Sequence, residues 1–270
     1  MTSRQMTTSA VLFYDSEHRD AVPMGWFERA FRFLSEYGLS PILFTAGGGQ
    51  FELDDCYVLA DPGNGLFKWG EEIPARRSDL LDALREGQIY GLGLDSPRDN
   101  ALNRSDWRAD LSAFSIDGEL YLGVDEELVS DPVALLRKAC DIAKDLFDVR
   151  YGFAYKMELA DEPACYASGP GKRPLSEVFE MIRHRREWAK RKKTPDELWS
   201  EELREQRRHL TGLFRGAFPA NILSESHVRA ADLKSQGVGR LTERDNSLWL
   251  WELSESEISQ AQAMLEARSS

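Results

Sequence analysis

The sequence predicts an α+β protein with a mainly antiparallel sheet and helices packed on it, with ferredoxin-like elements in the first half and a helix-rich second half. Three observations support this fold class. The first half alternates β-rich and helical runs, in the order β-α-β, then several strands, then α-β. The run "DLSAFSIDGELYLGV" places two β-rich segments around "DG", which is typical of an antiparallel hairpin. After residue 161, helical periodicity dominates.

The first elements are short strands around one amphipathic helix. The apolar run "SAVLFY" at 9–14 predicts a buried strand, and "PILFT" at 41–45 predicts the next one. Between them lies a helix for which Gly38 suits the C-terminal stop. Residues 46–75 are rich in Gly, Pro and Asp and predict a long ordered loop, with one strand at "CYVLA". The apolar positions at helical spacing are Trp26, Phe27, Ala30, Phe31, Leu34 and Tyr37.

Two further helices follow. The stretch "RRSDLLDALREG" predicts a short helix with Ser78 as its N-cap and Gly87 as its stop, and "QIYGLGL" predicts a strand after it. Beyond the hairpin, "SDPVALLRKACDIAKDLF" predicts a helix that Asp131 or Ser130 caps, with Pro132 in the first turn. Residues 149–159 then form a strand. The apolar face of that helix consists of Leu136, Ala139, Cys140, Ala143 and Phe147.

The second half begins with two charged helices. Residues 174–193 end in a strongly basic run, and the next helix starts at Thr194 with Glu197 in capping-box spacing. A short helix capped by Ser224, a short piece at "GRLTE" and a strand at "SLWLWEL" follow. Ser254 with Glu257 then starts a final helix that closes the fold.

Size and charge bound the organisation of the chain. With 270 residues and 42% hydrophobic content, the chain can form a single α+β domain over 1–270 or divide into an acidic part, 1–160, and a helix-rich part, 161–270. Residues 1–150 hold 15 Lys and Arg against 27 Asp and Glu, whereas residues 151–270 hold 19 of each. The first part is therefore expected to repel nucleic acid and to attract a basic partner, although solubility alone also explains an acidic surface.

Cysteine usage and hydropathy indicate a soluble cytoplasmic protein without membrane partners. The cysteines Cys56, Cys140 and Cys165 have no close pair, which argues against a disulfide framework and a zinc site. The start of the chain lacks an apolar signal segment, and no window approaches 18 apolar residues. No cofactor is expected, and a homodimer is left open.

The search for catalytic motifs favours a protein that is not an enzyme. The sequence contains neither H-E-x-x-H nor G-x-S-x-G, and "TAGGGQ" lacks the lysine and hydroxyl of a phosphate loop. The run at 183–193 carries seven Lys and Arg against one Glu, but the acidic remainder opposes nucleic-acid binding. A solvated helix end that pairs with acidic residues is the favoured interpretation of this run.

A polar loop after the first strand is the best candidate for chemistry. Asp15, Glu17, His18 and Asp20 follow that strand and have the residue types of a metal or proton-transfer site. One short loop without a second ligand cluster favours a solvated or partner-binding role instead. The acidic side chains that we predict as partner-binding are Asp15, Glu17, Asp20, Asp54 and Asp55.

The stretch "FRGAFPANILSESHV" is predicted to fold a corner rather than a catalytic site. Pro219 biases the preceding residue toward an extended conformation, and Asn221 can stabilise a turn through its local backbone. Arg215 can satisfy carbonyl groups at a helix end, and His227 falls in the first turn of a short helix. A conformational role accounts for all four residues.

With its surroundings, this stretch resembles a family of bacterial immunity proteins that are encoded beside secreted antibacterial toxins, including toxins delivered by type VI secretion. The segments that carry the resemblance are Tyr151-Gly152 at the start of a strand, "YASG", "RGAFPANILSESH", "GRLTE" and "LWLW". It covers about residues 149–265, and the charged helical insertion at 183–208 departs from it. The resemblance implies structural roles for the residues Tyr151, Gly152, Arg215, Pro219, Asn221 and His227.

The leading hypothesis is therefore an immunity protein that binds a cognate toxin and blocks it without catalysis. Acidic residues would steer a basic toxin, and aromatic side chains would supply much of the affinity. A small-molecule enzyme with a polar site near Asp15 to Asp20, joined by His227, is one alternative. A structural component of a phage or secretion assembly is another, and it predicts a symmetric oligomer.

Overall fold

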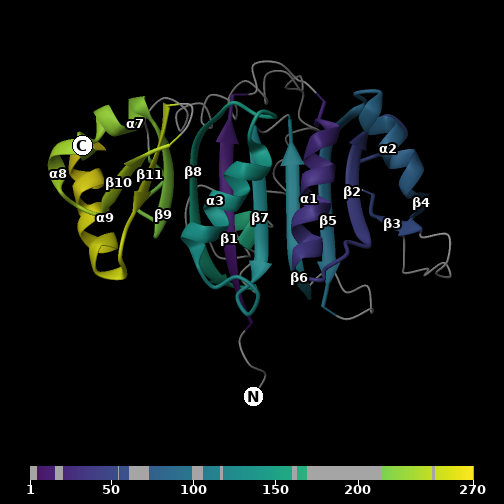
Figure 1. Ribbon diagram of the computed structural model, residues 1–270, viewed down its shortest axis with the longest axis horizontal. Helices are drawn as coiled ribbons and strands as arrows, with labels where there is room; N and C mark the ends of the chain where they lie inside the picture. Colours follow the sequence, from purple (N-terminus) through teal and green to yellow (C-terminus); the bar gives the residue numbers. More distant parts are fainter. Residues whose placement is uncertain are drawn as a thin grey trace, which may run out of the picture.

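The computed structural model describes residues 5–15, 21–53, 55–60, 73–98, 106–115, 118–159, 163–168, 214–244 and 247–269. Within these ranges, the strands form one sheet in the order β10-β11-β9-β8-β1-β7-β6-β5-β2-β3-β4 (Figure 1). The strands are β1 (Met6–Tyr14), β2 (Leu43–Gly48), β3 (Tyr57–Ala60), β4 (Ile73–Arg76), β5 (Ile89–Pro97), β6 (Trp107–Phe114), β7 (Glu119–Asp125), β8 (Val149–Glu158), β9 (Ala220–Ser224), β10 (Arg240–Glu243) and β11 (Leu248–Glu252).

The sheet is antiparallel except at one edge, where β3 pairs in parallel with β4. The described helices are α1 (Met24–Glu36), α2 (Arg77–Arg85), α3 (Pro132–Ala143), α4 (Pro163–Ser168), α7 (Glu225–Ala230), α8 (Leu233–Gln236) and α9 (Glu255–Ser269). This confirms the predicted α+β class with a mainly antiparallel sheet. In the described ranges, no helix combines the length and the apolar character that a membrane crossing requires.

Two finer predictions about the fold are not confirmed. The strands of the first half join a single long sheet with β1 in its middle, so no separate ferredoxin-like unit stands out. The predicted helices over 174–193 and from Thr194 onward lie outside the described residues. The described part of the second half adds β9, β10 and β11 to the sheet as well as helices, and the first four residues of "ANILS" are all buried in β9.

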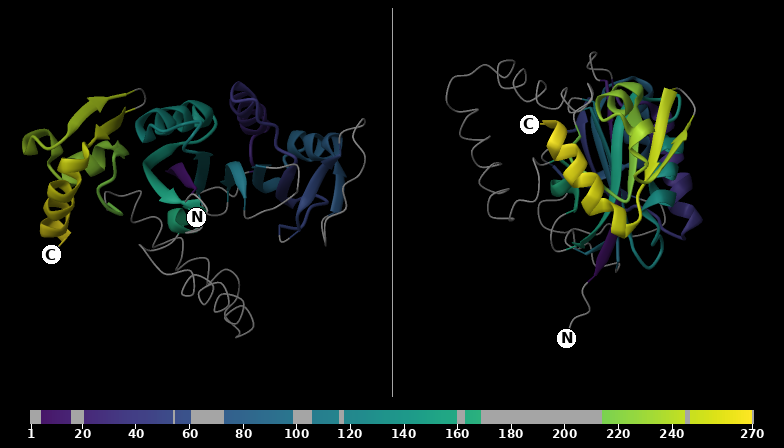
Figure 2. Two further views of the ribbon diagram at one scale, coloured as in Figure 1. Left: turned by 90° about the horizontal axis from the view of Figure 1, so that it is seen from below. Right: turned by 90° about the vertical axis from the view of Figure 1, so that its left-hand side faces the viewer.

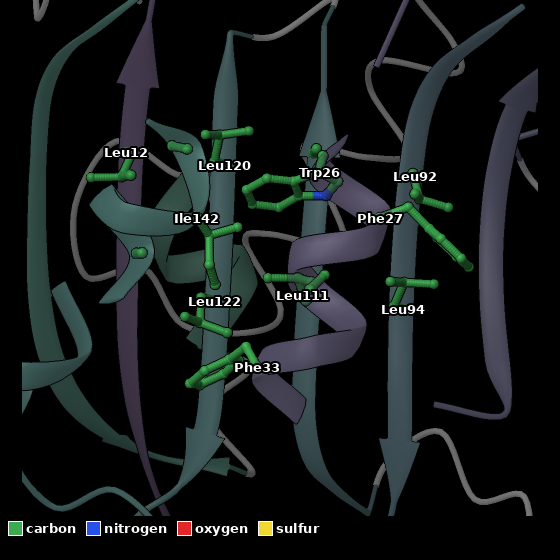
Figure 3. Packing of buried hydrophobic residues seen from close by; sticks show 14 of the residues in the cluster. Leu12, Trp26, Phe27, Phe33, Leu92, Leu94, Leu111, Leu120, Leu122 and Ile142 are labelled. Atoms are coloured by element: carbon green, nitrogen blue, oxygen red, sulfur yellow. The ribbon is translucent and has the colours of Figure 1, made fainter. Parts of the chain in front are cut away.

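One face of the sheet packs against α1, α2 and α3. Because side chains alternate along a strand, Leu120, Leu122 and Val124 of β7 all point to this face and are buried. Figure 3 shows Trp26 of α1 and Ile142 of α3 packed over them. Each such large apolar side chain contributes about 1.5–3 kcal/mol when it is fully buried.

The opposite face, called the second face below, has its own core. Val11 and Phe13 of β1, Phe153 of β8 and Trp251 of β11 point to this side and are buried. Figure 2 shows α4 and α9 on this side of the sheet, with α1, α2 and α3 on the other. The sheet is thus covered by helices on both faces over its central strands.

The helix ends of α1, α2 and α3 follow the predicted signals except at the start of α2. Asp131 accepts a hydrogen bond from the backbone N–H of Val133 at 2.9 Å and caps α3 as predicted. Gly38 and Gly87 adopt the left-handed conformation, with φ of 68° and 67°, just after α1 and α2. The prediction of Ser78 as the cap of α2 is wrong: β4 runs directly into this helix, so Arg76 takes the N-cap position.

Candidate functional site

The segments that carry the family resemblance lie together at one end of the sheet. Tyr151 and Gly152 lie in β8, and the stretch around Pro219 continues through β9 into α7. "GRLTE" provides β10 and "LWLW" provides β11, so these segments build the adjacent strands β8, β9, β11 and β10 (Figure 1). Part of "YASG" ends α4, which contacts β1 and β7 on the second face. Segments far apart in sequence therefore form one continuous unit.

Arg215 connects three parts of this unit. Its backbone N–H donates to the Tyr151 hydroxyl at 3.0 Å, and its guanidinium donates to the carbonyl oxygens of Tyr166, at 3.3 Å, and Ala167. The guanidinium carbon lies 5.6 Å from the centre of the Phe153 ring. Burial lowers the pKa of Arg215 from its ordinary value. This arginine thus holds the end of α4 against β8, whereas the helix predicted directly before Arg215 lies outside the described residues.

His227 is part of the same packed corner. Its ring is stacked on Tyr151, with centroids 4.9 Å apart and an interplanar angle of 11°, and its side chain is fully buried. The His227 Nδ1 atom and the Ser224 hydroxyl share a hydrogen bond of 2.7 Å. Burial also raises the pKa of the Tyr151 phenol. Ser224 takes the predicted N-cap position of α7, but its hydroxyl bonds to His227 and Ser226 instead of to the helix backbone.

Asn221 stabilises a sheet rather than the predicted turn. It lies in β9, and its side-chain amide donates to the carbonyl oxygens of Phe218 at 2.7 Å and Trp251 at 3.3 Å. The backbone N–H of Leu253 donates to the Pro219 carbonyl at 3.0 Å, so the residues beside Pro219 pair with the end of β11. Sequence reasoning missed β9 for two reasons. Pro219 and Asn221 are turn signals, and β9 itself is only five residues long.

Gly152 is required by the close approach of β1. A Cβ atom at this position would lie 2.6 Å from the Val11 carbonyl oxygen and 2.7 Å from a methyl group of Leu12. The first of these is a backbone atom in the middle of the sheet, which cannot move without disturbing the β1–β8 pairing.

The predicted acidic partner-binding residues are only partly described. Asp15 is exposed just after β1, and its backbone N–H donates to the Asp148 carbonyl at 3.2 Å. Asp55 is half-buried before β3. Glu17, Asp20 and Asp54 lie outside the described residues. Four strands lie between β1 and β3 in the sheet. At about 4.8 Å between neighbouring strands, β1 and β3 are about 24 Å apart, so the structure does not bring Asp15 and Asp55 together.

A pair of carboxylic side chains that sequence reasoning missed lies elsewhere on the second face. Asp95 of β5 and Asp110 of β6 are half-buried and directly opposite each other in the antiparallel register, which places their carboxyl groups within hydrogen-bonding reach of one another. Burial raises the pKa of Asp95 to about 6 and raises the pKa of Asp110 well above its ordinary value. Nothing in the sequence fixes this register, since β5 and β6 are joined by a long connection rather than by a tight turn.

A row of mostly small or polar residues extends from this pair across the second face. Asp110 is opposite Gly123 of β7, and Gly123 is opposite Ser9 of β1. The Ser9 hydroxyl bonds to the Tyr121 hydroxyl at 3.0 Å. A Cβ atom at Gly123 would lie 2.3 Å from that Tyr121 oxygen, so the glycine leaves room for the tyrosine to lie flat over the strand. In the described ranges, His, Cys, Asp and Glu side chains form no group of three suited to a metal ion.

Comparisons with known proteins find a likeness among solved structures. No protein-family model matches the chain, and no curated protein matches it. Among solved structures, the chain is similar to the Pseudomonas aeruginosa T6SS protein PA0821, with 10% sequence identity, a TM-score of 0.45, and coverage of 97% of this chain and 72% of that chain.

Proposed function

We propose that this protein is an immunity protein, which binds and neutralises a cognate secreted bacterial toxin by occlusion and without catalysis. The toxin would be delivered by a secretion system such as type VI, and the protein would act in the cytoplasm of the cell it protects. The sequence resemblance over about residues 149–265 suggests this class.

We call the unit formed by α4, α7 and the strands β8, β9, β11 and β10 the family-like unit. The observation that carries the proposal is that three polar residues of this unit bond to other parts of the protein. Arg215 binds the end of α4, His227 is buried between Tyr151 and Ser224, and Asn221 ties β9 to β11. Side chains held in this way support a scaffold, because none of the three is presented to a substrate. A scaffold of this kind leaves its outer surface for recognition of another protein.

The alternative of an enzyme around Asp15 to Asp20 receives less support. That hypothesis requires His227 to converge with the loop after β1 as a general base. The imidazole of His227 is fully buried, stacked on Tyr151 and bonded to Ser224, which supports a packing role over that of a base at a solvent-facing loop. Asp15 itself is exposed at the end of its strand.

The charge distribution suggests the character of the toxin. The acidic first 150 residues would steer a basic protein, such as a nuclease, toward the surface of this one. Complementary charge raises the association rate. Salt screens this attraction, so binding should weaken as the salt concentration rises.

The test is co-expression with the product of the neighbouring toxin gene. Cells that express this toxin should survive only when the protein is present, and the two proteins should co-purify. If cells without the protein resist every neighbouring toxin equally well, the proposal is wrong.

A further inference from the structure

The Asp95–Asp110 pair lies at a junction of the sheet. Asp95 lies in β5, and Asp110 lies opposite it in β6. Among the described strands, the sheet continues beyond β5 only through β2, β3 and β4. Directly after Asp95, the pairing of β5 with β6 shifts its register between Ser96, which is opposite Ala109, and Pro97, which is opposite Trp107. The strands beyond the junction therefore depend on a pairing that is already interrupted beside the two carboxyl groups.

Two hydrogen-bonded carboxyl groups must hold a proton between them. A carboxylate can only accept a hydrogen bond, so one member of the pair has to be protonated to donate. Two ionised carboxylates at directly opposed positions repel each other, and like charges at such positions destabilise strand pairing. The directly opposed carboxyl groups of Asp95 and Asp110 can therefore bond to each other only while the pair keeps one proton.

Among the described residues, the neighbouring strands place no basic side chain directly beside the pair on this face. On the same face, β2 contributes Leu43 and Thr45, and β7 contributes Gly123, Tyr121 and Asp125. Beyond Leu43 lie Val58 of β3 and Cys56, which pack against it.

The nearest basic side chains are already engaged with other acids. Arg108 lies two residues before Asp110. Its Nε atom is 3.5 Å from Asp125 Oδ2, and its Nη2 atom is 3.9 Å from Glu127 Oε2. The Nη2 atom of Arg98 is 2.5 Å from Asp125 Oδ2. Within the described residues, no ion pair involves Asp95 or Asp110.

We propose that Asp95 and Asp110 form a proton-sharing lock between β5 and β6, and that loss of the shared proton loosens this part of the sheet. The lock is a pH-sensitive device built into the fold and is independent of the proposed toxin binding. It holds the acidic flank formed by β5, β2, β3 and β4 more tightly in mildly acidic than in alkaline solution.

The direction of the pH dependence follows from the binding of the proton. Burial raises the pKa of both carboxyl groups, so the folded protein keeps a proton that the unfolded chain has already released above about pH 4. The contribution of the pair is therefore greatest at low pH. It is lost as the pH rises toward and through the folded-state values, of which that of Asp95 is about 6.

The test is urea unfolding of the full chain between pH 5 and pH 8, for the wild type and for Asp110→Asn and Asp95→Asn. An asparagine can donate permanently to the remaining carboxylate, so each variant should keep the lock closed at alkaline pH. From pH 5 to pH 8 the unfolding constant of the wild type should rise roughly tenfold or more relative to the Asn variants. Asp82→Asn, which removes an exposed carboxylate paired with Arg85, should follow the wild-type curve.

A second measurement locates the effect and does not depend on the variants folding. Amide hydrogen exchange of the wild type, corrected for the intrinsic effect of pH, should show β5 and β6 losing protection at pH 8 relative to β8 and β9. Parallel unfolding curves for the wild type and Asp110→Asn, or equal changes in protection for the two pairs of strands, would overturn the proposal. Since no toxin is present in either experiment, these results leave the proposed function untouched.

Discussion

Arg215 shows how single buried polar residues organise the family-like unit. Its backbone and guanidinium groups reach the Tyr151 hydroxyl and the carbonyl oxygens that end α4. Removing such a side chain leaves carbonyl acceptors without their donor and removes the guanidinium that lies over the Phe153 ring. The consequence is a loss of stability rather than a loss of a chemical step.

The Arg215→Ala variant should lower the free energy of unfolding by about 2–3 kcal/mol, as measured by urea titration. Arg215→Lys should recover part of the loss, because it keeps the charge but not the planar donors. Arg229→Ala, which removes an arginine whose side chain is 79% exposed, should leave the unfolding midpoint nearly unchanged. Equal effects of Arg215→Ala and Arg229→Ala would show that Arg215 does not hold this corner.

Sequence reasoning at this scale selected Arg215, Asn221 and His227 for structural roles and did not find the carboxyl pair. Arg215, Asn221 and His227 stand out locally, because they lie in one short stretch with a proline. Asp95 and Asp110 become neighbours only through the pairing of β5 with β6. Their sequence positions are compatible with ordinary solvated strand ends, and only the register reveals the contact.

At the scale of elements, the strands and helices follow local signals while their order in the sheet does not. The hairpin of β6 and β7, the cap of α3 and the final helix α9 were predicted from turn residues, capping residues and apolar spacing. The Ser254 N–H donates to Glu257 at 2.8 Å, as the spacing of a capping box indicates. The placement of β1 between β7 and β8 depends on long-range pairing, which no local pattern encodes.

The cap of α3 can be tested directly. Asp131→Ala removes the acceptor for the Val133 N–H and should destabilise the protein by about 1 kcal/mol, measured as a lower urea midpoint at unchanged slope. Asp131→Asn retains an oxygen acceptor and should behave like the wild type. If the alanine variant matches the asparagine variant, the cap does not contribute to stability.

The β1–β8 pairing offers a second test at this scale. Gly152→Ala should destabilise the fold by about 1–3 kcal/mol, because its new Cβ atom meets the Val11 carbonyl oxygen. Gly25→Ala is a suitable control, since its Cβ atom meets only the flexible end of Leu146, at 3.1 Å, and alanine favours a helix. A Gly152→Ala protein as stable as the Gly25→Ala protein would contradict the close approach of the two strands.

For the whole molecule, one long sheet joins two regions of different character. The strands β8, β9, β11 and β10 carry the family-like unit, and the strands β6, β5, β2, β3 and β4 belong to the acidic part of the chain. The proposed function assigns scaffolding to the first region and electrostatic attraction of a basic partner to the second. Under this proposal both regions would act on the partner through binding alone, so inhibition should require one molecule of protein for each molecule of toxin.

The most direct measurement of this central claim is a titration of purified toxin activity with purified protein. The account predicts that activity falls linearly and reaches zero near equal molar amounts, and that active toxin returns when the complex is dissociated. If a small fraction of an equivalent inactivated the toxin over time, the protein would be acting as a catalyst, and the account would be contradicted.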